Sequence, residues 1–568
     1  MSRLLKGVQR ELNQKISKDI SCREWHDSIV LEGILESWED VFRAGKIAVG
    51  RGYKGVVNRI EVRNLVIPEI KKPCINDLAL EGKKVDVLII GGGIIGTSIA
   101  RELSKWDVSI LLVDKENDIA MHASSRNDGM IHPGIEPKPG SKKAYFNVLG
   151  NSLYTRISEE LDVPIRRSGS TILYDKSWVK AAIPFIKLRA LKNNVPGVSF
   201  ISKEKAKEYE PNITDEIVGA VHFDTTGVTS PYKMTIAYAE NAAMNGVELS
   251  LNTIVLSMEK EGDRIILVKT NRGKIYPEVV INAAGVYSDK IAGMAGDQFF
   301  TVHPRKGQIV FLDKKKGCLV NSIVSKPDLN TLKKNTKGGG IVKTLEGNIL
   351  IGPDAYEQPY REDYSTDKEN IDRILKRHLS TIKGLNQTDV ITYCAGIRAS
   401  TYEEDFIIEA SDYVKNLVYA SGIQSPGFAS APAIALEIER ITKAILSKYK
   451  EVKPNPSWNP KRKGIPDLNL MTLEERKRMI EKRPDYGVIV CRCEGISKGE
   501  IVDALKSPIP VDSIDGVKRR VRAGMGRCQG GFCMPLVMEI IRDERNCDLT
   551  SITKKGRESF VVAGETKK

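Results

Sequence analysis

Long apolar runs and secretion signals are missing from this 568-residue sequence. No apolar run approaches the ~18 residues that a membrane-spanning helix needs, and the N-terminus is polar and charged, unlike a signal peptide. The nine cysteines do not follow a secreted disulfide pattern, because five are scattered and four cluster late. We therefore expect a cytoplasmic protein without a transmembrane segment, either free or peripheral at the inner face of the membrane.

A nucleic-acid-binding motif is also missing, although the chain is basic, with a net charge of +14. The Lys and Arg residues are scattered rather than gathered on one element. This charge favours anionic substrates, acidic partners or anionic lipid head groups, and we expect no nucleic-acid partner. The length is sufficient for about three or four domains.

A glycine-rich turn between two apolar runs is the strongest pattern present. Residues 85–90 are typical of a buried parallel strand, and Gly91, Gly93 and Gly96 follow with the spacing G-x-G-x-x-G. Such glycines allow a tight turn, the approach of a pyrophosphate, and close packing of helix on strand. Asp114 ends the next apolar run and can accept hydrogen bonds from a ribose. We expect a dinucleotide-binding fold, the alternative being a glycine-rich turn in another α/β protein. The expected contacts are Gly91, Gly93, Ile94, Ile95, Gly96, Asp114 and Lys115.

Residues 1–80 precede this fold and form an added α/β module. Apolar residues recur at helical spacing from Leu4 to Leu12, and Ser37 is placed to cap a second helix. Segments 31–37 and 55–62 resemble a BON domain, a small α/β module linked to membrane or protein attachment. The alternative is a stabilising appendage without a ligand. Pro68 and the turn at 71–73 end the module.

Small residues in the loop at 123–134 would let the backbone approach a bulky planar ligand. With the strand, glycine turn and acid before it, this loop resembles the flavoproteins of the D-amino-acid oxidase superfamily. Segment 137–144 is similar to the branch that contains L-2-hydroxyglutarate oxidases. The resemblance implies that the nucleotide fold holds FAD and that the loop passes along the isoalloxazine ring; the alternative is an ordinary helix cap. The implied contacts are Ser124, Ser125, Asn127, Gly129 and Met130.

Two later segments match the superfamily where its chain returns to the nucleotide fold. The strand at 279–282 runs into a small-residue turn, and the run at 421–428 precedes a helix. The resemblance implies that the first is a second FAD contact and that the second faces the pyrimidine edge of the flavin. It adds as FAD contacts Ala284, Gly285, Gly422, Gln424, Ser425, Pro426, Gly427 and Phe428.

The expected fold class is therefore α/β and α+β multidomain. A Rossmann-like FAD-binding domain, at about 84–150, 250–300 and 395–450, is interleaved with a mixed-sheet substrate domain at about 150–250 and 300–395. In the superfamily, the arginine matching Arg398 binds the anionic group of the substrate, a task that suits the planar guanidinium. His132 is the candidate base because its ordinary pKa lies near ~6.5, although it could instead contact only the flavin. Lys306 is a second candidate for charge in the pocket.

Four cysteines distinguish the C-terminal part of the chain. A linker at 451–487 leads to a domain at 488–545, followed by a tail at 546–568. Within the domain, C-x-C and C-x4-C pairs supply four thiolates that fit either zinc or a [2Fe–2S] cluster. The stretch resembles the bacterioferritin-associated-ferredoxin-like [2Fe–2S] domain and the C-terminal tail of anaerobic glycerol-3-phosphate dehydrogenase large subunits. The expected ligands are Cys491, Cys493, Cys528 and Cys533. The basic run at 518–522 is interpreted as a solvated helix face, or as a feature that docks an acidic partner or screens the cluster.

Together these resemblances imply an FAD-dependent dehydrogenase that oxidises a small anionic hydroxy substrate and passes electrons through a [2Fe–2S] cluster to a partner. The C-terminal match favours sn-glycerol 3-phosphate, which gives dihydroxyacetone phosphate. The middle of the chain equally resembles enzymes of L-2-hydroxyglutarate, and an electron-transfer subunit without its own substrate is a third hypothesis. The expected partner is an acceptor flavoprotein or another redox subunit in an oligomeric complex.

Overall fold

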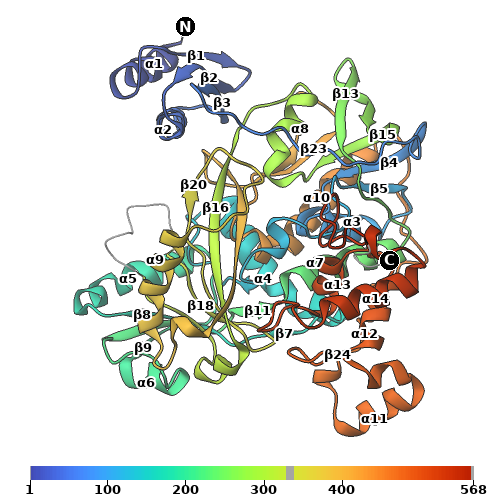
Figure 1. The fold of residues 1–568 in the computed structure, drawn as a ribbon. Coiled ribbons are helices and arrows are strands. Elements are labelled where there is room, and N and C mark those ends of the chain that lie inside the picture. The colour runs from blue at the N-terminus through green and yellow to red at the C-terminus, as the bar shows by residue number, and fades with distance from the viewer. Residues whose placement is uncertain (1, 328–337, 565–568) are drawn as a thin grey trace.

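The computed structural model describes residues 2–327 and 338–564 (Figure 1). Residues 2–62 form a small module in which two helices pack on a three-stranded sheet ordered β1-β2-β3. Leu5, Val8 and Leu12 point into its core, as their helical spacing predicts. The Ser37 hydroxyl accepts a hydrogen bond from the Asp40 N–H and caps the second helix, also as predicted. The elements are α1 (Arg3–Lys15), β1 (Ile20–Trp25), β2 (Ser28–Leu35), α2 (Trp38–Ala48) and β3 (Gly55–Val62).

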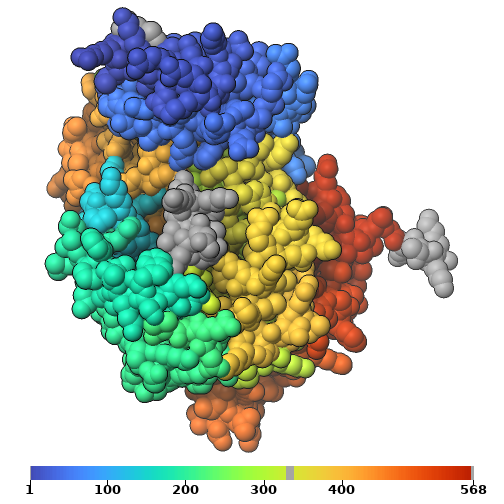
Figure 2. Space-filling model, turned by 90° about the vertical axis from the view of Figure 1, so that its left-hand side faces the viewer, coloured from blue at the N-terminus to red at the C-terminus, as the bar shows by residue number. Residues whose placement is uncertain are grey.

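This N-terminal module is docked against the rest of the chain. The Lys46 Nζ lies 2.9 Å from Glu404 Oε1, and the Asn58 side-chain amide donates to the Tyr402 hydroxyl at 2.9 Å. The Tyr402 ring packs against Gly45, where an added Cβ would lie 2.2 Å from the ring. Figure 2 shows the module as a blue cap at one end of the molecule.

The nucleotide domain is built on an eight-stranded sheet whose centre is parallel. β4 lies between β5 and β15, and β23 joins the far side of β15. Four strands from three distant parts of the chain therefore end at one edge of the sheet, where α/β proteins bind ligands. Helices α3 and α10 pack against one face of the sheet together with α4 (Lys142–Leu161) and α7 (Pro231–Met244). The strands are β4 (Lys83–Ile90), β5 (Ile110–Val113), β12 (Glu248–Ser250), β13 (Val255–Glu261), β14 (Arg264–Thr270), β15 (Gly273–Asn282), β22 (Ile407–Ala410) and β23 (Leu417–Ser421); the helices of this domain are α3 (Ile94–Leu103), α8 (Ser288–Met294) and α10 (Gly427–Leu446).

The second domain holds a nine-stranded mixed sheet, interleaved in sequence with the first. Its long strands β16 and β21 pair antiparallel, with Lys306 opposite Ile397 and Arg305 opposite Arg398. This pairing brings the strand of Arg398 back toward the nucleotide domain. The strands are β8 (Ser170–Tyr174), β9 (Val198–Ser202), β10 (Gly219–Phe223), β16 (Val302–Leu312), β17 (Ile323–Ser325), β18 (Gly340–Lys343), β19 (Ile349–Gly352), β20 (Tyr356–Glu357) and β21 (Val390–Thr401). A small sheet contains β6 (Met130–Ile131), β7 (Ile165–Arg166) and β11 (Gly227–Thr229), and the helices of the second domain are α5 (Ile183–Lys192), α6 (Lys203–Tyr209) and α9 (Lys368–His378).

The C-terminal module packs beside helix α7 (Figure 1). Part of the segment expected to be a linker is structured here. Helix α11 begins where the Thr472 hydroxyl and the Glu475 carboxylate form a reciprocal capping box. The elements are α11 (Leu473–Lys482), β24 (Ile489–Cys491), β25 (Ile496–Ser497), α12 (Lys498–Leu505), α13 (Ile514–Val521) and α14 (Met534–Arg545). Across the described residues, no helix combines the length and apolar character needed to cross a bilayer.

Candidate active site and cysteine cluster

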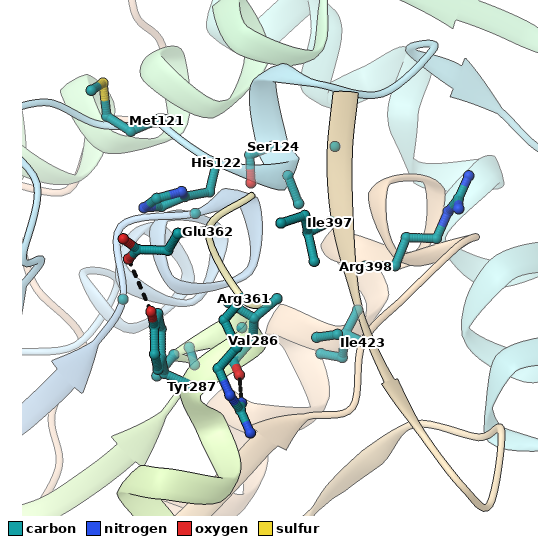
Figure 3. A pocket seen from close by; sticks show the side chains of 18 of the residues that line it. Met121, His122, Ser124, Val286, Tyr287, Arg361, Glu362, Ile397, Arg398 and Ile423 are labelled. Atoms are coloured by element: carbon teal, nitrogen blue, oxygen red, sulfur yellow. Dashed lines mark hydrogen bonds between the residues drawn. The ribbon is translucent and has the colours of Figure 1, made fainter. Parts of the chain in front are cut away.

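A cavity of about 860 Å³ opens where the parallel strands end. Its walls come from the turns that follow β4, β5, β15 and β23, together with the loop at 121–132 and strand β21 (Figure 3). Of the sequence-predicted residues, this cavity brings together Gly91, Gly93, Ile94, Ile95, Asp114, Lys115, Ser124, Asn127, Met130, His132, Ala284, Gly285, Arg398, Gln424, Ser425, Pro426, Gly427 and Phe428. Five predicted residues do not line it: Gly96, Ser125, Gly129, Lys306 and Gly422.

The glycine turn has the close packing that its sequence predicts. Gly91 has a φ of +117°, and a Cβ on it would lie 2.3 Å from the carbonyl oxygen of Ala283. A Cβ on Gly96 would lie 1.9 Å from the carbonyl oxygen of Gly91. These spaces keep the start of α3 against the sheet and leave a backbone cradle at the helix N-terminus, which suits a pyrophosphate.

We expect Gly96→Ala to destabilise the protein by about 3 kcal/mol and to lower its flavin content, because the added methyl must push α3 away from Gly91. Thermal unfolding and flavin absorbance of the purified variant measure both effects. Gly293→Ala is the matched control, since its Cβ would meet nothing closer than 3.7 Å. Equal stability of the two variants would refute this packing role.

Asp114 and Lys115 lie at the end of β5. The half-buried Asp114 carboxylate accepts from the Gly92 N–H at 2.6 Å and from the Glu116 N–H at 2.8 Å, and desolvation raises its pKa. Carboxylate oxygens have further lone pairs, so both bonds leave capacity for ribose hydroxyls. The Lys115 Nζ lies 2.6 Å from Glu362 Oε1.

Arg398 lines the cavity, and its guanidinium is incompletely hydrogen-bonded. Its Nη2 donates to the Asp354 carbonyl at 3.2 Å, whereas its buried Nη1 has no hydrogen-bond partner among the described residues. Burial lowers the pKa of this guanidinium, and nearby Arg305 lowers it further. A bound anion would relieve both costs. Ile397 and Arg398 extend to opposite sides of β21 (Figure 3), and both line the cavity.

The candidate base His132 lines the same cavity. Its backbone carbonyl accepts from the side-chain amides of Asn147 and Asn151 at 2.8 and 2.9 Å, which fixes the loop. Lys306 is placed differently: its Nζ lies 2.8 Å from the Asp363 carboxylate and 3.0 Å from the Ser365 hydroxyl, outside the lining. Lys306 therefore supports the loop that holds Asp363.

The other predicted residues outside the lining have structural explanations. Gly129 and Gly422 have φ values of +66° and +64°, and an added Cβ on Gly129 would lie 2.1 Å from the Thr229 carbonyl oxygen. The Ser125 hydroxyl donates to the His122 carbonyl at 3.2 Å. These residues shape the two turns from behind the cavity wall.

Sequence reasoning missed the loop at 360–364, which follows β20 and lines the cavity. The Tyr287 hydroxyl donates to Glu362 at 3.0 Å (Figure 3). Arg361 donates to both carboxylate oxygens of Asp289 at 2.8 and 2.9 Å. The guanidinium of Arg126 lies 4.0 Å from the centre of the Tyr364 ring. The sequence signal for this loop was its dense run of charged and aromatic residues, which is typical of a functional loop. Residues 67–72, which leave the N-terminal module, line the cavity as well.

The four predicted ligand cysteines lie together on two loops. The Sγ atoms of Cys493 and Cys528 are 3.6 Å apart, and the buried thiols of Cys491 and Cys533 are hydrogen-bonded to each other. Hydrogen bonds from Cys533 and from backbone N–H groups lower the pKa of Cys491 to about 6. Backbone N–H groups also hydrogen-bond the Cys528 sulfur. Four grouped thiols with N–H···S bonds fit a [2Fe–2S] cluster.

The basic run at 518–522 is not a solvated face, because it joins the C-terminal module to the nucleotide domain. Arg519 and Arg520 donate to the buried Asp118 carboxylate at 2.5 and 3.0 Å. Burial raises the pKa of Asp118, but the two guanidinium groups outweigh it and hold the pKa at about 2. Arg522 bridges Glu494 and the Tyr232 hydroxyl at 3.2 and 2.8 Å. The structure thus corrects the interpretation of this run as a solvated helix face.

Comparison with known proteins places both parts of the chain. Residues 86–440 match the FAD dependent oxidoreductase (DAO) family, and residues 489–543 match the BFD-like [2Fe-2S] binding domain. A glycerol 3-phosphate dehydrogenase from Caloramator mitchellensis is 40% identical over 485 residues, covering 85% of this chain and 99% of that chain. A subunit of the anaerobic glycerol-3-phosphate dehydrogenase of Escherichia coli K12 is 24% identical over 488 residues, covering 80% and 87%.

The structural comparison agrees. The FAD-bound L-alpha-glycerophosphate oxidase of Mycoplasma pneumoniae matches with a TM-score of 0.62 and 29% identity, covering 67% of this chain and 98% of that chain. The fold class, the FAD and [2Fe–2S] cofactors and the oxidoreductase class expected from the sequence are confirmed. The chain belongs to the family of FAD-dependent oxidoreductases, and it carries a BFD-like [2Fe–2S] domain at its C-terminal end.

Proposed function

We propose that this protein is an FAD-dependent sn-glycerol 3-phosphate dehydrogenase that produces dihydroxyacetone phosphate. The observation that carries the proposal is the unpartnered Nη1 of Arg398, a residue that lines the cavity formed at the ends of the parallel strands. A phosphate or carboxylate group is the natural partner of such a guanidinium. The glycerol 3-phosphate enzymes among the relatives favour phosphate.

The cofactors fit the residues present. The glycine turn, Asp114, the loop at 123–131 and the turn at 423–428 would hold FAD, and the four grouped cysteines would hold the cluster. When bound, FAD supplies a two-electron acceptor and the [2Fe–2S] cluster a one-electron carrier. We assign to Arg398 the grip on the substrate phosphate. An imidazole nitrogen of His132 takes the proton of the secondary hydroxyl as the carbinol carbon becomes a carbonyl.

We further propose that the electrons leave at the cysteine cluster for a separate redox subunit. Arg492, Arg527 and Phe532 are exposed beside the ligand cysteines, and the Arg492 guanidinium lies 5.9 Å from the Phe532 ring. A basic and aromatic surface of this kind suits an acidic partner. The Escherichia coli relative is named as one subunit of its enzyme, which supports an assembly of several chains. We place this assembly at the inner face of the membrane, in peripheral contact.

Anaerobic mixing of the holoenzyme with single substrates tests the proposal. Glycerol 3-phosphate should bleach the flavin band near ~450 nm, while L-2-hydroxyglutarate and amino acids should leave it unchanged. Bleaching by L-2-hydroxyglutarate alone would assign the enzyme to 2-hydroxy acids. If none of these substrates bleaches the flavin, the chain is an electron-transfer subunit without a substrate of its own.

A further inference from the structure

The segment from residue 177 to α5 exposes large apolar side chains on the surface of the second domain. Trp178, Phe185, Leu188 and Leu191 are exposed by 60%, 74%, 47% and 73%. On α5, Phe185, Leu188 and Leu191 follow one another every three residues, so they share one side of the helix. Helix α5 lies at the edge of the molecule, away from the nucleotide domain (Figure 1). We call these four side chains the α5 surface.

The α5 surface is not needed to hold the helix in place, because a different side of the helix does this. Ile186 and the buried Ala190 pack against a small core around Val221 and Phe223. The Arg189 guanidinium donates to the Ile135 carbonyl at 2.9 Å, and Asn193 donates to the Gly134 carbonyl at 2.9 Å. A surface helix whose outer side is also apolar has a second apolar side exposed to water, and such exposed apolar patches mark binding sites for a partner or a membrane.

The charges of this segment all have one sign. No Asp or Glu occurs from residue 176 to residue 203, whereas the segment holds several exposed basic residues. The nearest acid before it, Asp175, pairs with Lys326 at 3.2 Å. The exposed basic residues are Lys176, Lys180, Lys187, Arg189 and Lys192.

We propose that the α5 surface binds a bilayer containing anionic lipids, with α5 lying in the plane of the interface. Trp, Phe and Leu side chains flanked by Lys are the composition of interfacial helices, and each Lys near the bilayer is attracted by anionic head groups. No described helix can cross the bilayer, so the contact is with one leaflet only. The inference rests on the peripheral contact proposed above and names its surface and lipid class.

Sedimentation of the full-length holoenzyme with vesicles tests the inference. We expect binding to phosphatidylcholine vesicles that contain phosphatidylglycerol, and weak binding to phosphatidylcholine alone. The double variant Phe185→Ser/Leu191→Ser should lower the bound fraction at least about tenfold, since it removes two apolar side chains that would be buried in the bilayer. The triple variant Lys180→Gln/Lys187→Gln/Lys192→Gln should lower it about tenfold or more and reduce its dependence on salt.

The matched control is Leu470→Ser/Leu473→Ser, which removes two leucines of similar exposure, 71% and 77%, from the C-terminal module. This control should bind vesicles as the unaltered protein does. The Phe185/Leu191 variant should still oxidise glycerol 3-phosphate with a soluble dye at the unaltered rate. If the unaltered protein binds neither vesicle, both the peripheral contact and the lipid-binding role of the α5 surface are refuted. If the unaltered protein binds vesicles and the Phe185/Leu191 variant binds them as well as the control does, the protein still contacts the membrane. The α5 surface is then refuted as the place of contact.

Discussion

Replacing Arg398 by methionine is expected to lower kcat/KM for glycerol 3-phosphate by about 10³-fold, equivalent to about 4 kcal/mol of transition-state stabilisation. The substrate phosphate would enter a cavity from which its buried cationic partner has been removed, so its desolvation would go uncompensated. The FAD content should not change, because the hydrogen bond of Arg398 within the described residues is made to the Asp354 carbonyl. Steady-state kinetics and flavin absorbance measure the two quantities.

Arg398→Lys separates charge from shape. Lysine keeps the positive charge but loses the planar, two-pronged donor, so kcat/KM should fall by about tenfold to hundredfold, less than for methionine. Loss of FAD in either variant would show that Arg398 holds the cofactor instead of the substrate. An unchanged kcat/KM would remove Arg398 from the site.

Replacing Cys528 by serine should abolish the iron–sulfur signal of the reduced protein. Serine offers a hard oxygen where the cluster needs a thiolate, and Cys528 lies beside Cys493 at 3.6 Å between the sulfurs. Reduction of a one-electron acceptor should then fall to background, while glycerol 3-phosphate still bleaches the flavin. Electron paramagnetic resonance and stopped-flow absorbance check the two outcomes separately.

Cys318→Ser is the control for this loss, because Cys318 is an exposed thiol on the second domain. Its iron content and spectrum should match those of the unaltered protein. A Cys528→Ser protein that keeps the signal would contradict the ligand assignment. Stoichiometric zinc in the unaltered protein, with a silent spectrum, would contradict the cluster itself.

The parts of the site that the sequence predicted are those made by short, local patterns. In the turn at Gly91 and in each cysteine pair, the functional residues lie within a few positions of one another. Their spacing in the sequence is therefore enough to predict that they lie close together. Lys306 shows the limit of such reasoning. Its side chain meets the Asp363 carboxylate and the Ser365 hydroxyl, which lie 57 and 59 residues later in the sequence, and no local pattern around Lys306 indicates these partners.

Long-range contacts explain what could not be predicted. The loop at 360–364 reaches the cavity because Arg361 is held by Asp289, more than 70 residues earlier in the chain. The sequence shows that the run at 518–522 is basic, but it does not identify the acidic partner, since Asp118 lies about 400 residues away in sequence. A basic run in a sequence predicts that an acidic partner is needed. Only the fold shows whether this partner is a residue of the same chain.

The clamp between Asp118 and the C-terminal module has a thermodynamic consequence. Asp118 lies on the short stretch between Asp114 and Ser124, both of which line the cavity, and Arg557 of the tail pairs with Glu116 on the same stretch at 2.7 Å. Any ligand that orders this stretch therefore also favours the docked position of the cysteine-bearing module. By thermodynamic reciprocity, docking of the module favours binding of that ligand by the same coupling free energy. Docking of the module and binding of a ligand that orders this stretch therefore stabilise each other.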